Sequence, residues 1–279
     1  MPRTRNALFI TTSTTTITAP LWTGSKKASS NTTFFLPISR MSESSTTTSG
    51  KIDANAPAKS PLFGTVRMTF YITYILLITT GTITLIEALR TPNAAVRHVM
   101  NLETCISVIA GYFYSQFIEK VNLSNGVLNY LEINEMRYND WFITTPLMIL
   151  VLMMSLSYST GRYSVHFGTF VLGMLLNFGM LFSGYLGEKG TISRNMGCAV
   201  GFLFFVLLFG LIYVSFVRGS GKMFNYVFFG LYVGIWSMYG VTYLLDEETK
   251  NIVYNVLDVT AKCFVGLGLW AYFTKIIVE

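Results

Sequence analysis

From about residue 65 onward, the chain alternates between long apolar runs and short polar connections. A helix needs about 20 residues to cross about 30 Å of hydrocarbon, and each apolar run is close to that length. Seven such runs follow one another, at 65–89, 97–119, 137–158, 165–186, 196–217, 223–245 and 251–275. The connection 120–136 is longer than the others and could hold a small hairpin. The pattern predicts an all-α membrane protein, built as a seven-transmembrane-helix bundle.

Residues 1–60 have a different character. They are rich in Ser, Thr, Ala and Pro, show little apolar periodicity, and contain no acidic residue before Glu43. This composition is typical of a transit-type leader or a disordered tail. We therefore predict two parts, a Ser/Thr-rich tail or leader over 1–60 and the helical transmembrane domain over 61–279.

Composition agrees with the membrane assignment and excludes other classes. The chain is 52% hydrophobic and 12% charged, with a mean hydropathy of +0.50, whereas a soluble domain carries about 25% charged residues. The net charge of +6 comes from basic residues that are scattered or lie in the tail, so no nucleic-acid partner is expected. The three cysteines lie inside apolar runs and the two histidines near predicted helix ends, so no metal site is expected.

Seven crossings place the two termini on opposite sides of the membrane. Lysine and arginine accumulate in cytoplasmic loops. With a cytoplasmic C-terminus, the inner loops and tail hold Arg90, Arg97, Arg162, Arg218, Lys222 and Lys275. The short outer loops then hold Lys120, Lys189, Arg194 and Lys250, together with most of the loop acids. This bias favours an N-terminus outside and a cytoplasmic C-terminus.

Five ionisable residues lie well inside the predicted spans: Glu103, Arg137, Asp140, Asp258 and Lys262. Each costs about 2.5 kcal/mol or more to insert at membrane depth, so each is a functional candidate. Asp258 and Lys262 are four residues apart and therefore face the same side of one helix. A lysine in an apolar site can form a Schiff base with a carbonyl compound. A purely structural Asp–Lys ion pair is the alternative.

The third run adds a second set of charges. Asp140, Thr144 and Val151 are spaced i, i+4 and i+11, which places them on one face of the helix, and Arg137 lies one turn further outward. Two carboxylates, one arginine and one lysine that carries a protonated imine would form a nearly neutral group. Such a group can be held in a low dielectric only when its charges are paired.

These residues stand in motifs that resemble a known family. The segments "RYNDWFITTPL" (137–147) and "LDVTAK" (257–262) are similar to the third- and seventh-helix signatures of type 1 (microbial) rhodopsins. The segment "WSMYGVTY" (236–243) resembles the aromatic pattern of the sixth helix around retinal, and Met180 and Gly184 have the fourth-helix spacing. The resemblance covers roughly 65–275.

The resemblance implies a role for each matching residue. Lys262 would carry all-trans retinal covalently as a protonated Schiff base, with Asp140 and Asp258 as its counterions. Asp140 would be the first proton acceptor after light converts the retinal to the 13-cis form. Thr144 would hydrogen-bond within that pair, and Arg137 would couple it to the outside. The residues expected to line the polyene are Trp141, Thr145, Met148, Met180, Gly184, Trp236, Tyr239 and Tyr243.

The sequence departs from outward proton pumps at Val151, where those pumps carry a carboxylate that reloads the Schiff base. Glu103 is expected in the cytoplasmic half of the second helix, either as an ion-pathway or proton-donor group or as a structural glutamate. Asn255 lies seven residues before Lys262, and with Glu103 it could form a polar gate between the second and seventh helices. This combination resembles the channel-type rhodopsins of giant viruses.

Three functions are therefore open. A light-gated cation channel is favoured, and an outward proton pump with Glu103 as substitute donor is the alternative. A photosensor ranks last, because the chain ends at Glu279 directly after the seventh run. In each case the resemblance implies an integral, multi-pass membrane protein rather than an enzyme. Its expected partners are retinal, the lipid bilayer, and transported cations or protons, and a homo-oligomer is possible.

Overall fold

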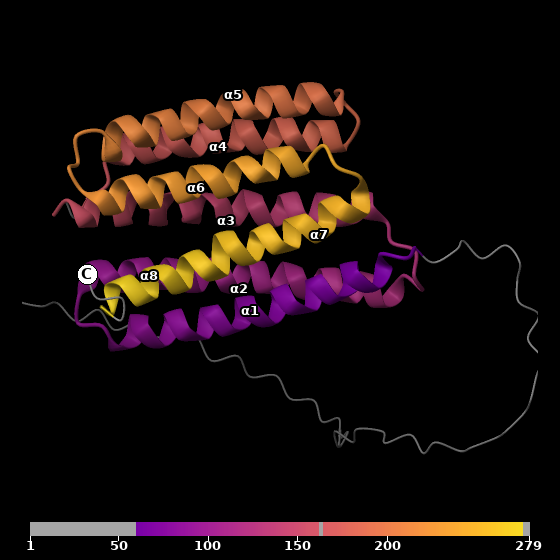
Figure 1. Cartoon of the computed structure of the whole chain (residues 1–279), viewed down its shortest axis with the longest axis horizontal. Coiled ribbons are helices and arrows are strands. Elements are labelled where there is room, and N and C mark those ends of the chain that lie inside the picture. Colours follow the sequence, from indigo (N-terminus) through magenta and orange to yellow (C-terminus); the bar gives the residue numbers. More distant parts are fainter. Residues whose placement is uncertain (1–59, 162–163, 276–279) are drawn as a thin grey trace, which may run out of the picture. The chain divides into compact units, whose positions relative to one another are not determined.

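A computed structural model describes residues 60–161 and 164–275, so the predicted tail falls outside the described residues except for its last position. The helices are α1 (Phe63–Arg90), α2 (Ala94–Leu123), α3 (Tyr130–Ser159), α4 (Phe167–Glu188), α5 (Arg194–Ile212), α6 (Met223–Thr242), α7 (Glu247–Asp258) and α8 (Val265–Phe273). Two π-helical segments are η1 (Tyr213–Val217) and η2 (Val259–Phe264). α5 continues into η1, and α7 continues through η2 into α8, which leaves seven rods (Figure 1). The prediction of an all-α, seven-helix bundle is confirmed.

Five of these rods are long and apolar enough to cross a membrane: α1, α3, α4, α5 with η1, and α7 with η2 and α8. α2 and α6 have 30 and 20 residues, which is also sufficient length. Their hydropathy is lower because α2 carries several charged side chains and α6 carries tyrosine, tryptophan and asparagine. Both still run alongside the apolar helices in the bundle (Figure 1).

The prediction of a hairpin over 120–136 is wrong. α2 extends to Leu123 and α3 begins at Tyr130, so only a short turn separates them. The side chain of Asn129 accepts a hydrogen bond from the backbone N–H of Glu132 and caps the start of α3. Lys120 and Glu132 form an ion pair of 2.6 Å across the turn. Both helices therefore continue beyond the apolar runs, where polar side chains satisfy their ends.

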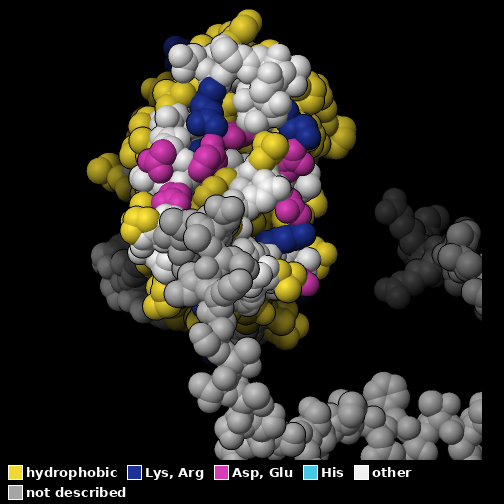
Figure 2. Space-filling model, turned by 90° about the vertical axis from the view of Figure 1, so that its right-hand side faces the viewer, with side chains coloured by type: hydrophobic (Ala, Val, Ile, Leu, Met, Phe, Trp, Pro, Cys, Tyr) yellow, Lys and Arg dark blue, Asp and Glu magenta, His cyan; other side chains and the backbone are white. Residues whose placement is uncertain are grey.

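The rods run antiparallel, so the connections alternate between two ends of the bundle (Figure 1). We call the end where α7 begins the Glu247 end, and the end where α8 finishes the Phe273 end. Figure 2 looks onto the Glu247 end and shows acidic and basic side chains gathered on it, with hydrophobic side chains around the rim. A polar end surrounded by apolar walls is the surface expected of a membrane bundle.

α3 and the rod formed by α7, η2 and α8 lie at the centre of the bundle. Of their most apolar windows, 56% and 61% are buried, against 28% for both α4 and the α5–η1 rod. The outer helices thus turn most of their apolar side chains outward, toward lipid. These two central rods also carry four of the five charged residues predicted for the site, and the fifth, Glu103, lies on α2.

Asp246 fixes the start of α7. Its Oδ1 accepts a hydrogen bond of 3.0 Å from the backbone N–H of Thr249. Hydrogen bonds from Thr249 lower the pKa of the Asp246 carboxyl, since they stabilise its charged form. An ionised cap at a helix N-terminus is also favoured by the helix dipole.

Asn225, near the start of α6, joins three segments. Its Nδ2 donates to the carbonyl oxygens of Leu156 in α3, at 3.1 Å, and Phe216 in η1, at 2.9 Å. Its Oδ1 accepts a hydrogen bond from the hydroxyl of Ser159. Asn225 is completely buried, and its bond to Leu156 lies wholly in the interior.

We predict that Asn225→Leu lowers the free energy of unfolding by about 1–3 kcal/mol, because the three hydrogen bonds of the Asn225 side chain are lost. Thermal denaturation followed by circular dichroism would show a lower midpoint. Val227→Leu changes a residue on the same helix that is 58% exposed and should leave the midpoint unchanged. If both variants lowered the midpoint equally, Asn225 would not be connecting α3, η1 and α6 as we propose.

Candidate functional site

The site is built around Lys262, which lies in η2 at the middle of the seventh rod. Its Nζ is 2.6 Å from Oδ2 of Asp140 in α3 and 3.4 Å from Oδ1 of Asp258 in α7. The three side chains are at most 1% exposed. A π-helical turn is often found at a functional site, because it changes the direction of the side chains that follow it. Here the π-helical turn contains Lys262, which contacts Asp140 on α3 and Asp258 on α7.

Arg137 forms the next layer of charge toward the Glu247 end. Its Nη1 is 3.4 Å from Oδ2 of Asp258 and 3.1 Å from the hydroxyl of Tyr114. Its Nη2 donates to Oδ1 of Asn251, at 3.1 Å, and to Oδ1 of Asn255, at 2.9 Å. The guanidinium is therefore held by one carboxylate and three neutral acceptors. This arrangement pays part of the cost of burying a full charge.

The two carboxylates have different surroundings. Asp258 faces four donors, since the hydroxyls of Tyr114 and Tyr239 each donate to it at 2.8 Å in addition to the two cations. Asp140 pairs only with Lys262, and its Oδ1 has no hydrogen-bond partner among the described residues. A carboxylate with a free oxygen is better placed to accept a proton than one whose oxygens are already bonded. The geometry thus separates a fixed negative charge from an available acceptor.

Thr144 differs from its expected role. Its hydroxyl donates to the backbone carbonyl of Asp140, at 2.9 Å, rather than to the side chains of the ion pair. Threonine hydroxyls commonly bond to the carbonyl four residues earlier in their own helix, and this local bond is the one formed. Thr144 is completely buried beside Asp140, so it supports the helix turn that carries the acceptor.

A mostly apolar cavity lies beside Lys262. All eight residues that the sequence predicts along the polyene line it: Trp141, Thr145, Met148, Met180, Gly184, Trp236, Tyr239 and Tyr243. Further walls come from residues that the sequence does not single out, among them Cys198, Gly201, Phe202, Phe205, Gly240 and Tyr254. Lys262 and Asp258, which form an ion pair with each other, are both among its walls.

Glycines keep this cavity open. A Cβ at Gly184 would lie 2.5 Å from the hydroxyl of Tyr138, and a Cβ at Gly240 would lie 2.6 Å from the ring of Phe202. Larger residues at these positions would force the aromatic walls to move. An apolar cavity with aromatic walls and one buried amine fits a conjugated aldehyde that is linked to Lys262.

Glu103 lies on the other side of Lys262, toward the Phe273 end. Its Oε2 is 2.8 Å from where a Cβ would stand at Gly266, four residues after Lys262. Glu103 is 2% exposed and has no hydrogen bond or ion pair within residues 60–161 and 164–275. The neighbouring Ser107 is also buried, and its hydroxyl has no partner there either. A buried carboxyl without a partner is a functional candidate rather than a stabilising group.

The predicted gate formed by Glu103 and Asn255 together is wrong. Asn255 belongs to the Arg137 network, where its Oδ1 accepts from Arg137 and lies 3.0 Å from the hydroxyl of Tyr114. Its Nδ2 also donates to the hydroxyl of Thr69, at 2.8 Å. Glu103 instead lies against Gly266, eleven residues further along the rod, which corresponds to about 16 Å of helix. The two groups thus flank Lys262 from opposite ends.

Three residues that the sequence motifs do not single out complete the site: Tyr114, Asn177 and Asn251. Tyr114 donates to Asp258, Asn251 accepts from Arg137, and Asn177 donates to the hydroxyl of Thr145 at 2.8 Å. Tyr114 lies eleven residues after Glu103, which places it on the same face of α2, so helical spacing could have identified it. The other two asparagines carry no such signal. No group of three or more metal-ligating side chains occurs in the described part of the chain.

Comparison with known proteins agrees with this geometry. A family model described as "Bacteriorhodopsin-like protein" matches residues 65–276. The crystal structure of viral rhodopsin OLPVRII is similar with a TM-score of 0.72 and 46% identity, over 77% of this chain and 100% of that one. The blue light-absorbing proteorhodopsin from Med12, at 22% identity and a TM-score of 0.58 over 76% and 97% of the two chains, shares the fold.

A curated relative is the green-light absorbing proteorhodopsin of Gamma-proteobacterium EBAC31A08. It is 27% identical over 154 residues, which are 48% of this chain and 59% of the relative, so less than two thirds of that protein is spanned. Rhodopsin family members bind retinal covalently through a lysine Schiff base. Microbial rhodopsins are light-driven ion transporters, channels or photosensors rather than enzymes.

The family model covers nearly all of the described helices, and the viral relative matches over its whole length. The chain is thus an integral, multi-pass membrane protein. It belongs to the bacteriorhodopsin-like family, the type 1 (microbial) rhodopsins, and is close to the viral rhodopsins.

Proposed function

We propose that Lys262 carries retinal in this protein and that the pigment gates ion movement. Retinal bound through a lysine supplies a light-driven change of shape, from all-trans to 13-cis, beside the lysine nitrogen. The support is the cavity next to Nζ, with its aromatic walls and its glycine-lined space. Asp140 and Asp258 balance the positive nitrogen, and Oδ2 of Asp140 is near enough, at 2.6 Å, to accept a proton from it.

We expect Lys262→Ala to abolish visible absorbance in protein supplied with all-trans retinal, because no other amine lines the cavity among the residues that the structure describes. Absorption spectra of the purified protein measure this. Lys189→Ala removes a lysine that is 41% exposed at the bundle surface and should leave the spectrum unchanged. Colour that persists in Lys262→Ala would exclude this attachment.

The finer function that we propose is a light-gated cation channel. The observation that carries it is a row of buried polar residues on α1, which faces α2 and the seventh rod. Thr73, Thr80 and Thr84 are spaced i, i+7 and i+11 on one face of the helix, and each is at most 1% exposed. If this face of α1 served only to pack against its neighbours, apolar side chains would be expected at these buried positions instead of hydroxyls.

Two of these threonines have polar partners on neighbouring rods, one toward each end of the bundle. Toward the Glu247 end, the hydroxyl of Thr73 donates to the backbone carbonyl of Asn255, at 3.3 Å. Toward the Phe273 end, the hydroxyls of Thr84 and Thr104 are 2.9 Å apart. Between them lies Glu103, against the seventh rod. We call Thr73, Thr80, Thr84, Thr104 and Glu103 the polar seam. It runs along the seventh rod from the level of Asn255 to that of Gly266, and Lys262 lies between these two levels. The carboxylate of Glu103 would favour cations over anions.

Current–voltage recording under illumination tests the channel. In a pore, the photocurrent should change sign with the driving force and should shift its reversal voltage when the cation gradient is changed. The seam predicts this outcome, because ions would move down their gradient through it. A photocurrent that stays outward at every voltage would instead identify a pump.

One observation favours the pump as a second candidate. Asp140 and Glu103 lie on opposite sides of Lys262, the first as an available acceptor and the second as a buried carboxyl without a partner. Val151, at the position of the usual pump donor, is completely buried in apolar contacts and cannot supply a proton. Glu103 would then return the proton to the lysine nitrogen from the Phe273 side.

Glu103→Gln separates the two candidates further. In a pump, the late phase of the photocycle should slow by about 100-fold, the scale of a lost general acid. In a channel, ion selectivity or conductance should change instead. Flash spectroscopy and photocurrents measure these effects. Glu119→Gln, at an exposed position of the same helix, should change neither the photocycle nor the photocurrent. If Glu103→Gln also changed neither, Glu103 would have a structural role only.

A further inference from the structure

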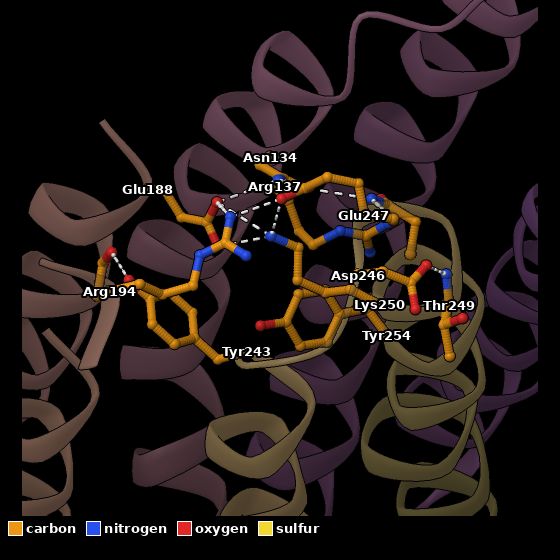
Figure 3. Close-up of polar contacts among 12 residues, drawn as sticks. Asn134, Arg137, Glu188, Arg194, Tyr243, Asp246, Glu247, Thr249, Lys250 and Tyr254 are labelled. Carbon is orange, nitrogen blue, oxygen red and sulfur yellow. Dashed lines mark hydrogen bonds and ion pairs between the residues drawn. The ribbon is translucent and has the colours of Figure 1, made fainter. Parts of the chain in front are cut away.

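Lys250 is the most unexpected charged residue of the Glu247 end. The sequence places it among the outer loop cations, but the structure buries it completely, one turn into α7. Its Nζ lies 2.8 and 3.0 Å from the two oxygens of Glu188 and 2.9 Å from Oε1 of Glu247. Figure 3 shows the amine between these two carboxylates. Its donors are therefore directed at acids on two different rods.

Two more side chains close the cluster. Nη2 of Arg194 is 2.6 Å from Oε1 of Glu247 and 3.7 Å from Oε2 of Glu188. Nδ2 of Asn134 donates to Glu188 at 3.2 Å and to Glu247 at 2.8 Å. Two cations thus balance two carboxylates. We call these five residues, Asn134, Glu188, Arg194, Glu247 and Lys250, the Lys250 cluster; they join α3, the end of α4, the start of α5 and the start of α7.

The cluster is connected to the retinal-side charges. Oδ1 of Asn134 accepts a hydrogen bond of 3.2 Å from Asn251, and Oδ1 of Asn251 accepts one of 3.1 Å from Arg137. Arg137 in turn contacts Asp258, the partner of Lys262. A continuous set of polar contacts therefore runs from the surface of the Glu247 end to the lysine nitrogen. Any movement of Arg137 must disturb Asn251 and, through it, Asn134.

The buried cation is essential to the balance of the cluster. Glu188 is 3% exposed, and among the described residues Lys250 is the only cation within hydrogen-bonding distance of it, since Arg194 is 3.7 Å away. A buried carboxylate that loses its cation is strongly destabilised unless water enters. Arg194 and Glu247 are 38% and 34% exposed, so water already reaches the edge of the cluster. Loss of the Lys250 charge would therefore draw that water inward.

We propose that the Lys250 cluster is an ionic lock that holds the start of α7 against α3 and α4 and keeps water at the Glu247 end away from Lys262. Lys250 acts as a positioning residue, because it touches neither the cavity nor the Lys262 ion pair. This inference rests on the proposed attachment of retinal to Lys262 for one of its two measurements only. The other measurement does not need retinal.

The test compares full-length wild type with Lys250→Met, which keeps much of the side-chain volume and removes the charge. Glu188→Gln/Lys250→Met removes one carboxylate with its cation and restores the charge balance. Lys189→Met breaks the exposed 2.7 Å pair with Glu135 and is the matched control. The first measurement is backbone hydrogen–deuterium exchange of peptides from 247–258, with peptides from 265–273 as internal reference. The second is the rate at which hydroxylamine, a small water-soluble nucleophile, removes the visible absorbance in the dark.

We expect amide exchange at 247–258 and bleaching by hydroxylamine to be at least about tenfold faster in Lys250→Met than in wild type. A tenfold change corresponds to a loss of about 1.4 kcal/mol in the free energy that keeps this end of the bundle closed. The double variant should return most of the way to wild type, and the control should not differ from it. Wild-type rates in Lys250→Met would overturn the lock. Equal acceleration in the single and double variants would also overturn it, because the effect would then come from packing rather than charge.

Two further outcomes keep the inference separate from the proposed function. A wild type that forms no pigment, or a pigment without photocurrent, would contradict the proposed function, whereas the exchange comparison would still test the lock. If Lys250→Met does not fold, Arg194→Met is measured instead. It removes the half-exposed cation of the cluster, and about a threefold faster exchange at 247–258 is expected; an unchanged rate would overturn the lock.

Discussion

The structure depends on one constraint: a lysine amine at membrane depth must be matched by negative charge. Lys262 meets Asp140 on one neighbouring rod and Asp258 on its own, and Arg137 balances the second carboxylate. Removing any one of these charges would leave an uncompensated ion in a low dielectric, where the cost is several kcal/mol. The positions of α3 and α7 relative to each other are therefore fixed by charge as well as by packing.

The same rule is applied twice along the seventh rod. Lys262 is paired at its middle and Lys250 near its start, each with one carboxylate of another helix and one of its own rod, and both lysines are completely or almost completely buried. The first pairing lies beside an apolar cavity and can respond to what the cavity holds. The second lies next to solvent, at the polar face of the bundle (Figure 2). Arg137, Asn251 and Asn134 connect the two lysines through hydrogen bonds, so a change in the surroundings of one lysine can alter those of the other.

The surroundings of the two aspartates and of Glu103 explain how one lysine can serve different ion movements. In the part of the chain that the structure describes, Asp258 accepts from two tyrosines, one oxygen of Asp140 has no partner, and Glu103 has no hydrogen bond or ion pair. A proton or cation that passes Lys262 thus meets a fixed charge, an acceptor and an isolated carboxyl in turn. Whether the polar seam of α1 widens enough to conduct, or only relays protons, is the difference between the two proposed functions.

The sequence by itself determined what depends on spacing within one helix. Apolar runs of membrane length predicted the seven rods, and fixed offsets placed Lys262 with Asp258 and Arg137 with Asp140, because the geometry within a helix is set by its 3.6-residue turn. The resemblance to microbial rhodopsins supplied the wall residues of the cavity. Each of them lines it.

Only the tertiary structure decided which groups on different helices meet. It separated Glu103 from Asn255, brought Tyr114 to Asp258, and buried Lys250 between two glutamates that the sequence assigned to loops. The physical reason is that hydropathy fixes neither the rotation of a helix about its axis nor its register against its neighbours. Those are set by side-chain packing and by the pairing of buried charges across rods.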